Sequence, residues 1–99
     1  MKLEFEWDEK KNELNIKKHG IDFNDVPTMF QYPLLTGLDI RQDYGEYRWI
    51  GIGTLRNRVI VIIFTERTNN KIRLISARKA NRYERQKYQE AIKNQLEQT

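Results

Sequence analysis

Six cationic side chains lie in or beside the last predicted strand and the last predicted helix: Arg67, Arg73, Arg78, Lys79, Arg82 and Arg85. The planar guanidinium of arginine can bind two phosphate oxygens at once, and lysine supplies a compact positive charge. Such side chains can hold the phosphates of a nucleic acid and stabilise the added negative charge of a pentavalent phosphorus centre. We expect Arg78 and Arg82 to take the second role and the other four to bind phosphate.

Ordinary ion pairing is the alternative for these cations, because exposed pairs are common and add little to stability. Under this alternative, Arg73 pairs with Glu66 across the last predicted hairpin. Arg82 and Arg85 would then simply point into solvent. The arrangement of the charges on the folded chain decides between the two interpretations.

Cleavage of RNA requires few groups besides such cations. The 2′-hydroxyl is a built-in nucleophile that needs only a base, and the leaving 5′-oxygen needs an acid. His19 is the only histidine, and histidine is the side chain that ordinarily titrates near neutral pH. Glu66 is the alternative base, and Tyr83 is a third group that could move a proton. Structural roles compete with these: His19 suits the C-terminal end of a helix, and Glu66 suits a cross-strand pair.

Aromatic side chains could contribute to binding of unpaired bases. Tyr44 and Trp49 are the residues we expect to stack on bases, as aromatic side chains often do with single-stranded RNA. Trp7 immediately precedes a predicted helix, so a place in the core is favoured for it.

The sequence lacks the side chains that several other kinds of functional site require. The chain has no cysteine, which removes disulfides, thiolate nucleophiles and cysteine-based zinc sites. Its acidic residues lie mainly in the N-terminal half and in turns, unlike the clustered carboxylates of magnesium sites. We therefore expect no metal and no cofactor. No run approaches the roughly 20 apolar residues of a membrane helix, and the acidic N-terminus is unlike a signal peptide, so we expect a cytoplasmic protein without membrane contact.

Charge is distributed unevenly along the 99 residues. Residues 1–55 hold seven Lys or Arg against ten Asp or Glu, whereas residues 56–99 hold eleven against four. The net charge of +4 therefore conceals a basic C-terminal half. A local excess of cations suits a polyanion, although a solvated basic surface is an equally ordinary interpretation.

The N-terminal segment predicts a strand followed by a helix. Residues 3–7 alternate apolar and acidic side chains, which is typical of a half-buried strand. Asp8 can cap a helix over residues 9–19, and Gly20 can end that helix in the left-handed conformation.

A second, short helix is predicted to reach Phe30. Asp22 or Asn24 can cap its N-terminus. Pro27 is compatible with this helix only in the first turn, where no backbone donor is needed.

Four strands follow, at residues 35–42, 47–54, 59–64 and 71–77. Turn signals separate them at residues 43–46, 56–57 and 68–70. The unbroken apolar run of residues 59–64 is typical of a central strand covered on both faces. Asn57 stands where a glycine is expected, but asparagine also accepts a positive φ.

The last predicted helix covers residues 79–95, and its apolar face comprises Ala80, Tyr88, Ala91, Ile92 and Leu96. Glu84 falls among these positions. An unpaired buried carboxylate is costly, so we expect Glu84 to pair with an arginine of the sheet. The predicted order is β-α-α-β-β-β-β-α, one α+β domain over residues 1–99 in which an antiparallel meander packs on helices.

Separated motifs in this order resemble the BrnT-type family of ribonuclease toxins. They cover residues 5–11, 18–23, 43–46, 65–67 and 72–80, with Arg48, Glu84 and Tyr88 beside them. The resemblance implies a RelE-like fold, and RNA cleavage that inhibits translation and growth. It also implies neutralisation by a BrnA-like antitoxin with a ribbon-helix-helix DNA-binding end. We expect a heterotetramer of two toxins and two antitoxins, which contacts DNA only through the antitoxin.

A non-catalytic module is the alternative function. Such a protein would bind nucleic acid or the antitoxin through the same basic surface and act only in control of its operon. No helix-turn-helix spacing is present, which disfavours direct reading of DNA by this chain.

Overall fold

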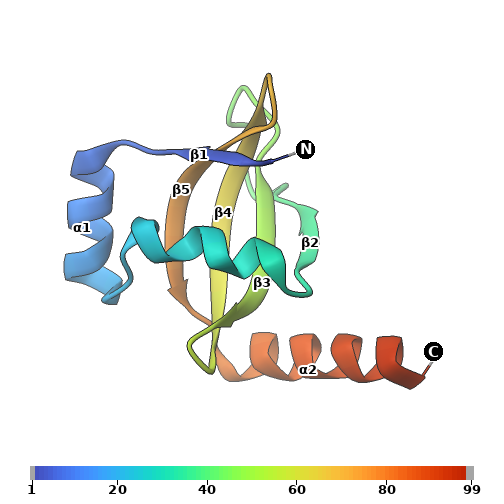
Figure 1. Cartoon of the computed structure of the whole chain (residues 1–99). Coiled ribbons are helices and arrows are strands. Elements are labelled where there is room, and N and C mark those ends of the chain that lie inside the picture. Colours follow the sequence, from blue (N-terminus) through green and yellow to red (C-terminus); the bar gives the residue numbers. More distant parts are fainter. Residues whose placement is uncertain (1, 98–99) are drawn as a thin grey trace.

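The computed structural model of the chain describes residues 2–97, which form five strands and three helices (Figure 1). The elements in chain order are β1 (Glu4–Glu6), α1 (Glu9–His19), the 3₁₀ helix η1 (Phe23–Gln31), β2 (Leu35–Leu38), β3 (Trp49–Leu55), β4 (Arg58–Arg67), β5 (Lys71–Lys79) and α2 (Arg82–Glu97). No helix within residues 2–97 is both long and apolar enough to cross a membrane.

The five strands form one sheet in the order β1-β5-β4-β3-β2. The predicted antiparallel meander is confirmed for β2 to β5, with β4 at the centre. The sheet as a whole is mixed, because β1 pairs in parallel with β5 through three residues. The sequence analysis did not predict where the N-terminal strand pairs, and the structure adds this distant strand to the edge of the meander.

The two faces of the sheet are covered differently. Helix η1 crosses one face, where Phe23, Val26 and Met29 pack on the even-numbered residues of β4 (Figure 1). Helix α2 packs across one end of the opposite face, where Tyr88 contacts a second cluster around Ile52 and Val61. We call these the η1 face and the α2 face.

Helix α1 begins and ends where the sequence predicts. The Asp8 carboxylate accepts hydrogen bonds from the N–H groups of Lys10 and Lys11, and Gly20 ends the helix at a φ of 72°. Helix η1 has the predicted Asp22 cap but is a 3₁₀ helix. Pro27 lies inside this helix beyond its first turn, so the prediction that the helix accepts Pro27 only in the first turn was wrong.

The connection between β2 and β3 is longer than predicted. Strand β2 ends at Leu38 rather than near residue 42, and β3 begins at Trp49, so the residues between them form a loop instead of a tight turn. The turn between β3 and β4 is short as expected, with Arg56 and Asn57 at φ values of 51° and 67°.

Helix α2 begins three residues later than predicted, because Arg78 and Lys79 belong to β5. The apolar face is confirmed for buried Ala80 and Tyr88. Leu96, in contrast, is 71% exposed, so its assignment to the core was wrong. The sheet ends before the helix does, which leaves the last turn without a surface to cover.

A buried side-chain amide binds the edge of β5 beyond the point where its pairing with β1 ends. The Asn15 side chain on α1 accepts a hydrogen bond from Ala77 N and donates to the carbonyl oxygens of Ala77 and Ile21. Since the pairing of β1 with β5 ends at Arg73, the amide takes the place of a neighbouring strand. It thereby fixes the backbone next to Arg78.

We predict that Asn15→Ala lowers the free energy of unfolding by about 3 kcal/mol, because three backbone groups lose their partner in a buried place. Urea unfolding followed by circular dichroism measures this change. Glu13→Ala, on the exposed side of the same helix, is the matched control. A loss no larger than that of the control would contradict the role of Asn15.

Candidate nucleic-acid interface

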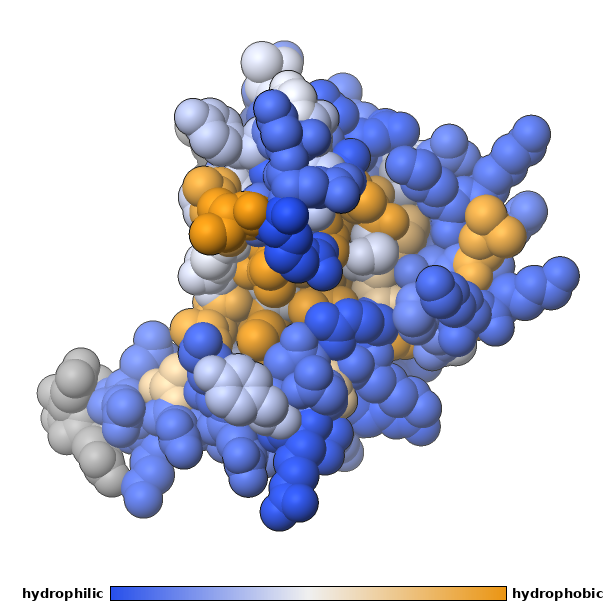
Figure 2. All heavy atoms as spheres, turned by 180° about the vertical axis from the view of Figure 1, so that it is seen from behind, coloured by the Kyte–Doolittle hydropathy of each residue, from blue (hydrophilic) through white to orange (hydrophobic). Residues whose placement is uncertain are grey.

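The α2 face gathers most of the arginines that the sequence singled out. The antiparallel register places Arg78 opposite Val61 and Arg73 opposite Thr65, and Val61 packs in the α2-face cluster. Because partners in an antiparallel pair share a face, both arginines lie on the α2 side. Figure 2 views the molecule from behind and shows hydrophilic residues around a hydrophobic centre above α2.

Three of the predicted cations, Arg67, Arg73 and Arg78, have carboxylate partners. Arg73 Nη1 lies 2.7 Å from Glu6 Oε2, so Arg73 does form an ion pair, as the alternative interpretation held, but its partner is Glu6 and not Glu66. The cause is the parallel strand β1, which places Glu6 beside Arg73. Arg67 lies 3.4 Å from Glu46, which also contacts Arg48 at 3.1 Å. These contacts hold the guanidinium groups in place but reduce the local positive charge.

The pairing of Glu84 with an arginine of the sheet is confirmed. Both carboxylate oxygens of Glu84 accept hydrogen bonds from Arg78, each at 2.8 Å. Glu84 also accepts a bond from Asn81 N, and Asn81 Oδ1 accepts one from Glu84 N, which is a capping box at the start of α2. The hydrogen bonds from Arg78 hold the pKa of Glu84 below its usual range. One carboxylate thus fixes both the helix start and the direction of Arg78.

A cluster in the β2–β3 loop was missed by the sequence analysis. Buried Asp39 accepts bonds from Arg41 Nε and Nη2 at 2.8 Å and from the Tyr44 hydroxyl at 3.0 Å. These bonds hold the pKa of Asp39 far below its usual range, and the Arg41 contribution is the largest. Arg41 lies near enough to Glu84 to lower the pKa of that carboxyl as well. The loop therefore brings another arginine toward Arg78.

The cations Lys79 and Arg82 form no ion pair within residues 2–97, and both are exposed. Arg85 is also exposed and donates one bond to the carbonyl of Ala80 at 2.9 Å. All three lie at the junction of β5 and α2, but Lys79 is the register partner of Ile60 in the η1-face core and so lies on the face opposite Arg78. Arg82 and Arg85 are therefore the predicted cations best placed to meet an external phosphate beside Arg78.

His19 lies at the last residue of α1, beside the same junction. Its pKa is lowered from the ordinary value of 6.5, first by partial burial and then by the charges of Lys18 and Arg78. Asn15, one turn earlier on α1, binds the backbone of Ala77, so this end of α1 lies close to the backbone next to Arg78. The lowered pKa favours the uncharged imidazole, which is the form that accepts a proton.

Glu66 is not brought to this place. It is exposed near the far end of β4, opposite Ile72, five residues along the strand from Val61, the partner of Arg78. At about 3.3 Å per residue, this spacing separates the two positions by roughly 17 Å. Glu66 also alternates to the η1 face, because its partner Ile72 packs in the core there.

The predicted aromatic residues have mixed surroundings. Trp49 is half-buried against the η1-face core, and Trp7 packs edge-on against Phe23 as its predicted core role requires. The guanidinium of Arg48 lies 4.3 Å from the centre of the Tyr44 ring. Tyr83, at the start of α2, is 68% exposed and stands next to Arg82.

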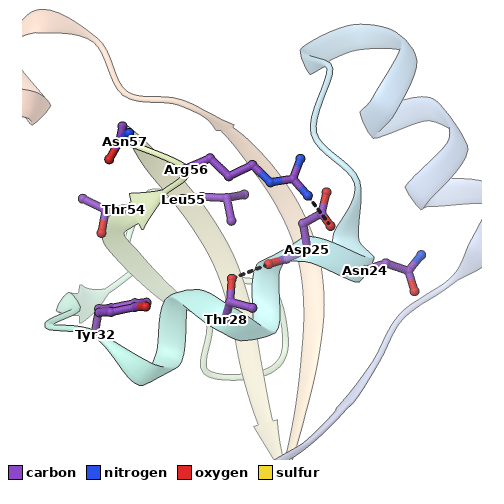
Figure 3. Close-up of a pocket in the computed structure, with 8 residues that line it drawn as sticks. All are labelled: Asn24, Asp25, Thr28, Tyr32, Thr54, Leu55, Arg56 and Asn57. Atoms are coloured by element: carbon purple, nitrogen blue, oxygen red, sulfur yellow. Dashed lines mark hydrogen bonds and ion pairs between the residues drawn. The ribbon is translucent and has the colours of Figure 1, made fainter.

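A polar cleft of about 580 Å³ lies away from these residues, between η1 and the β3–β4 turn (Figure 3). Its lining includes Tyr32, Thr28 and Asn57, and Arg56 crosses it to reach Asp25 at 3.3 Å. None of the predicted site residues lines it. Within residues 2–97, no group of three or more His, Cys, Asp or Glu side chains is placed to hold a metal ion.

Sheet and junction together define a small α+β protein in which exposed cations lie at the end of an arginine-rich sheet face, an arrangement typical of proteins that bind polyanions. The chain belongs to the family described as the ribonuclease toxin BrnT of type II toxin–antitoxin systems, whose model matches residues 7–84. Membership of a type II system implies an antitoxin partner.

A solved structure supports this assignment. The chain is similar to the ribonuclease toxin BrnT of Brucella abortus, with 29% sequence identity and a TM-score of 0.64. The match covers 82% of this chain and 100% of the Brucella chain. No curated protein sequence matches the chain.

We predict that Asp39→Asn lowers the free energy of unfolding by about 2 kcal/mol at pH 7, because the buried carboxylate loses charge-assisted hydrogen bonds. The folded pKa lies below the unfolded value of 3.8, so this stabilisation is present above pH 3.8 and is lost as the pH falls further. Urea unfolding at pH 7 and pH 3 should show the gap between variant and wild type narrowing. Asp43→Asn, in the same loop but exposed, is the control. The prediction would be contradicted if the difference in unfolding free energy between Asp39→Asn and the wild type were the same at pH 7 and pH 3.

Proposed function

We propose that this chain is a metal-independent endoribonuclease that cleaves RNA at the β5–α2 junction. The observation that carries the proposal is the placement of exposed Arg82 and Arg85 at the junction beside a fixed Arg78, with His19 at the end of α1. Family membership supplies the expectation of ribonuclease activity. The junction supplies the groups that such cleavage requires.

In the proposed mechanism, Arg82 binds the scissile phosphate and Arg78 stabilises the charge that develops on it. His19 accepts the proton of the 2′-hydroxyl, whose oxygen then attacks phosphorus. The 5′-oxygen departs and takes a proton from solvent or from Tyr83. The products are a cyclic phosphate and a 5′-hydroxyl. Arg67, Arg73 and Arg85 extend the surface that follows the RNA backbone.

The proposal includes the cellular setting that the resemblance implies. A BrnA-like antitoxin with a ribbon-helix-helix end would neutralise the chain in a heterotetramer of two copies of each. Cleavage of cytoplasmic RNA would inhibit translation and growth. The RelE-like character of the fold belongs to the same proposal, supported by the meander packed against helices on both faces.

A non-catalytic binding module remains the second candidate function. The observation that favours it is the pairing of Arg67, Arg73 and Arg78 with carboxylates, which weakens the positive field of the α2 face. Such a chain would bind RNA or antitoxin without cutting RNA.

We predict that the purified chain, free of antitoxin, cleaves single-stranded RNA in the presence of EDTA. Replacement of the nucleotide 5′ to the cut by its 2′-deoxy form should abolish cleavage, because the nucleophile is missing. Gel electrophoresis of end-labelled RNA measures both results. Binding without cleavage would favour the second candidate, and loss of cleavage in EDTA would refute metal independence.

We predict that Arg82→Ala reduces the cleavage rate by about 100-fold, the order expected for loss of one transition-state or phosphate contact. The melting temperature should change little, because Arg82 is exposed. Lys71→Ala is the control, an exposed cation at the opposite end of β5 from the junction. Equal rates for the two variants would remove Arg82 from the site.

We predict that the single-turnover rate falls as the pH drops through the lowered pKa of His19, because only the uncharged imidazole accepts a proton. His19→Gln should lose this dependence along with most of the activity. Rates measured from pH 5 to 8 test this, and an unchanged profile in the variant would exclude His19 as the base.

A further inference from the structure

A second cleft lies on the α2 face, beside the proposed cleavage site. It has a volume of about 370 Å³ and lies between β2, β3 and the first turns of α2. Leu35, Ile50 and Ile52 contribute apolar side chains to it. The hydrophobic centre of the view in Figure 2 lies in this region, above α2.

Gly37 makes the cleft hollow. The register pairs Gly37 with Ile50, so a side chain at position 37 would stand on the α2 face beside Ile50. A Cβ atom placed there would meet no other atom within 4 Å. The space above Gly37 is therefore open, and its φ is not in the left-handed region, so a larger residue can be tolerated there.

The edge of the sheet borders the same cleft. β2 is the last strand, so its outer backbone edge faces no strand of the described chain. Leu38 and Ile40 beside it are 42% and 82% exposed. Exposed apolar side chains along an open edge are a feature of strands that pair with another chain.

The charge at the cleft indicates what kind of segment fits. Lys87 lines it and forms no ion pair within residues 2–97, whereas the other charged lining residue, Glu84, is held by Arg78. The unbalanced charge of the lining is thus positive. A complementary segment is apolar where it meets Leu35 and Ile50, and acidic where it meets Lys87.

We propose that this cleft binds the antitoxin, through an extended apolar segment that lies along β2 and carries a carboxylate toward Lys87. The antitoxin is the partner that membership of a type II system implies. An extended segment pairs with the edge of β2 and directs alternate side chains into the space above Gly37. The inference rests on this partnership and not on the cleavage chemistry.

Gly37→Leu tests the proposal, because a side chain at this position has room at its Cβ atom and would extend into the open space. Isothermal titration of the purified chain with the antitoxin of its own operon should show binding weakened at least about tenfold, as for loss of a central interface contact. Gln31→Leu, exposed on η1 at the opposite face, is the control and should bind like the wild type. Unchanged affinity in a folded Gly37→Leu variant would overturn the proposal.

Two further measurements sharpen the test. Lys87→Glu should weaken binding, and binding should become less sensitive to salt, since an attractive charge contact is lost. Amide hydrogen exchange at residues 35–38 should slow in the complex. Exchange that stays fast, or a wild-type homodimer that Gly37→Leu dissociates, would show that the antitoxin is not the occupant.

RNA cleavage by Gly37→Leu separates this proposal from the proposed function. The variant should cut RNA at the wild-type rate while the antitoxin no longer inhibits it. If the wild type itself does not cut RNA, the proposed function fails, yet the titrations still decide where the antitoxin binds.

Discussion

The backbone of Ala77 must be satisfied at an edge of the sheet where no strand lies beside it, and the arrangement of the junction depends on how this is done. Strand β1 pairs with β5 only as far as Arg73, so Asn15 of α1 supplies the missing donor and acceptor. Buried backbone groups without partners are costly, which makes this amide a strong constraint on the place of α1. It brings the end of α1, with His19, next to Arg78.

The carboxylates on the α2 face have two opposite effects. They lower the positive charge available to a polyanion, yet they hold long arginine side chains in one conformation, which removes an entropic cost of binding. Glu84 shows the second effect most clearly, because its two oxygens bind Arg78 while its capping box fixes the start of α2. The exposed cations Arg82 and Arg85 then supply the charge that the paired arginines lack.

Local signals in the sequence were enough to predict what depends on a few neighbouring residues. Asp8, Gly20 and Asn57 specify helix and turn geometry through their own backbone and side-chain preferences. The parallel pairing of β1 and the β2–β3 loop cluster depend instead on contacts between distant residues. Asp39 carries no local pattern that distinguishes it from an exposed turn aspartate, so its burial and its bonds to Arg41 could not be predicted. Glu84 was predictable because its position on an apolar helix face demanded a partner.

The start of α2 links the two surfaces proposed for this face. Asn81, Tyr83 and Glu84 line the cleft beside β2, while Glu84 holds Arg78 and Arg82 lies one residue before Tyr83. A segment that fills the cleft therefore touches the residues that orient the cations of the junction. Inhibition would not require the segment to occupy the phosphate site, because Glu84, which lines the cleft, also holds Arg78. The partner can then be recognised through the apolar side chains around Gly37. This part of the cleft needs no positive charge for RNA binding.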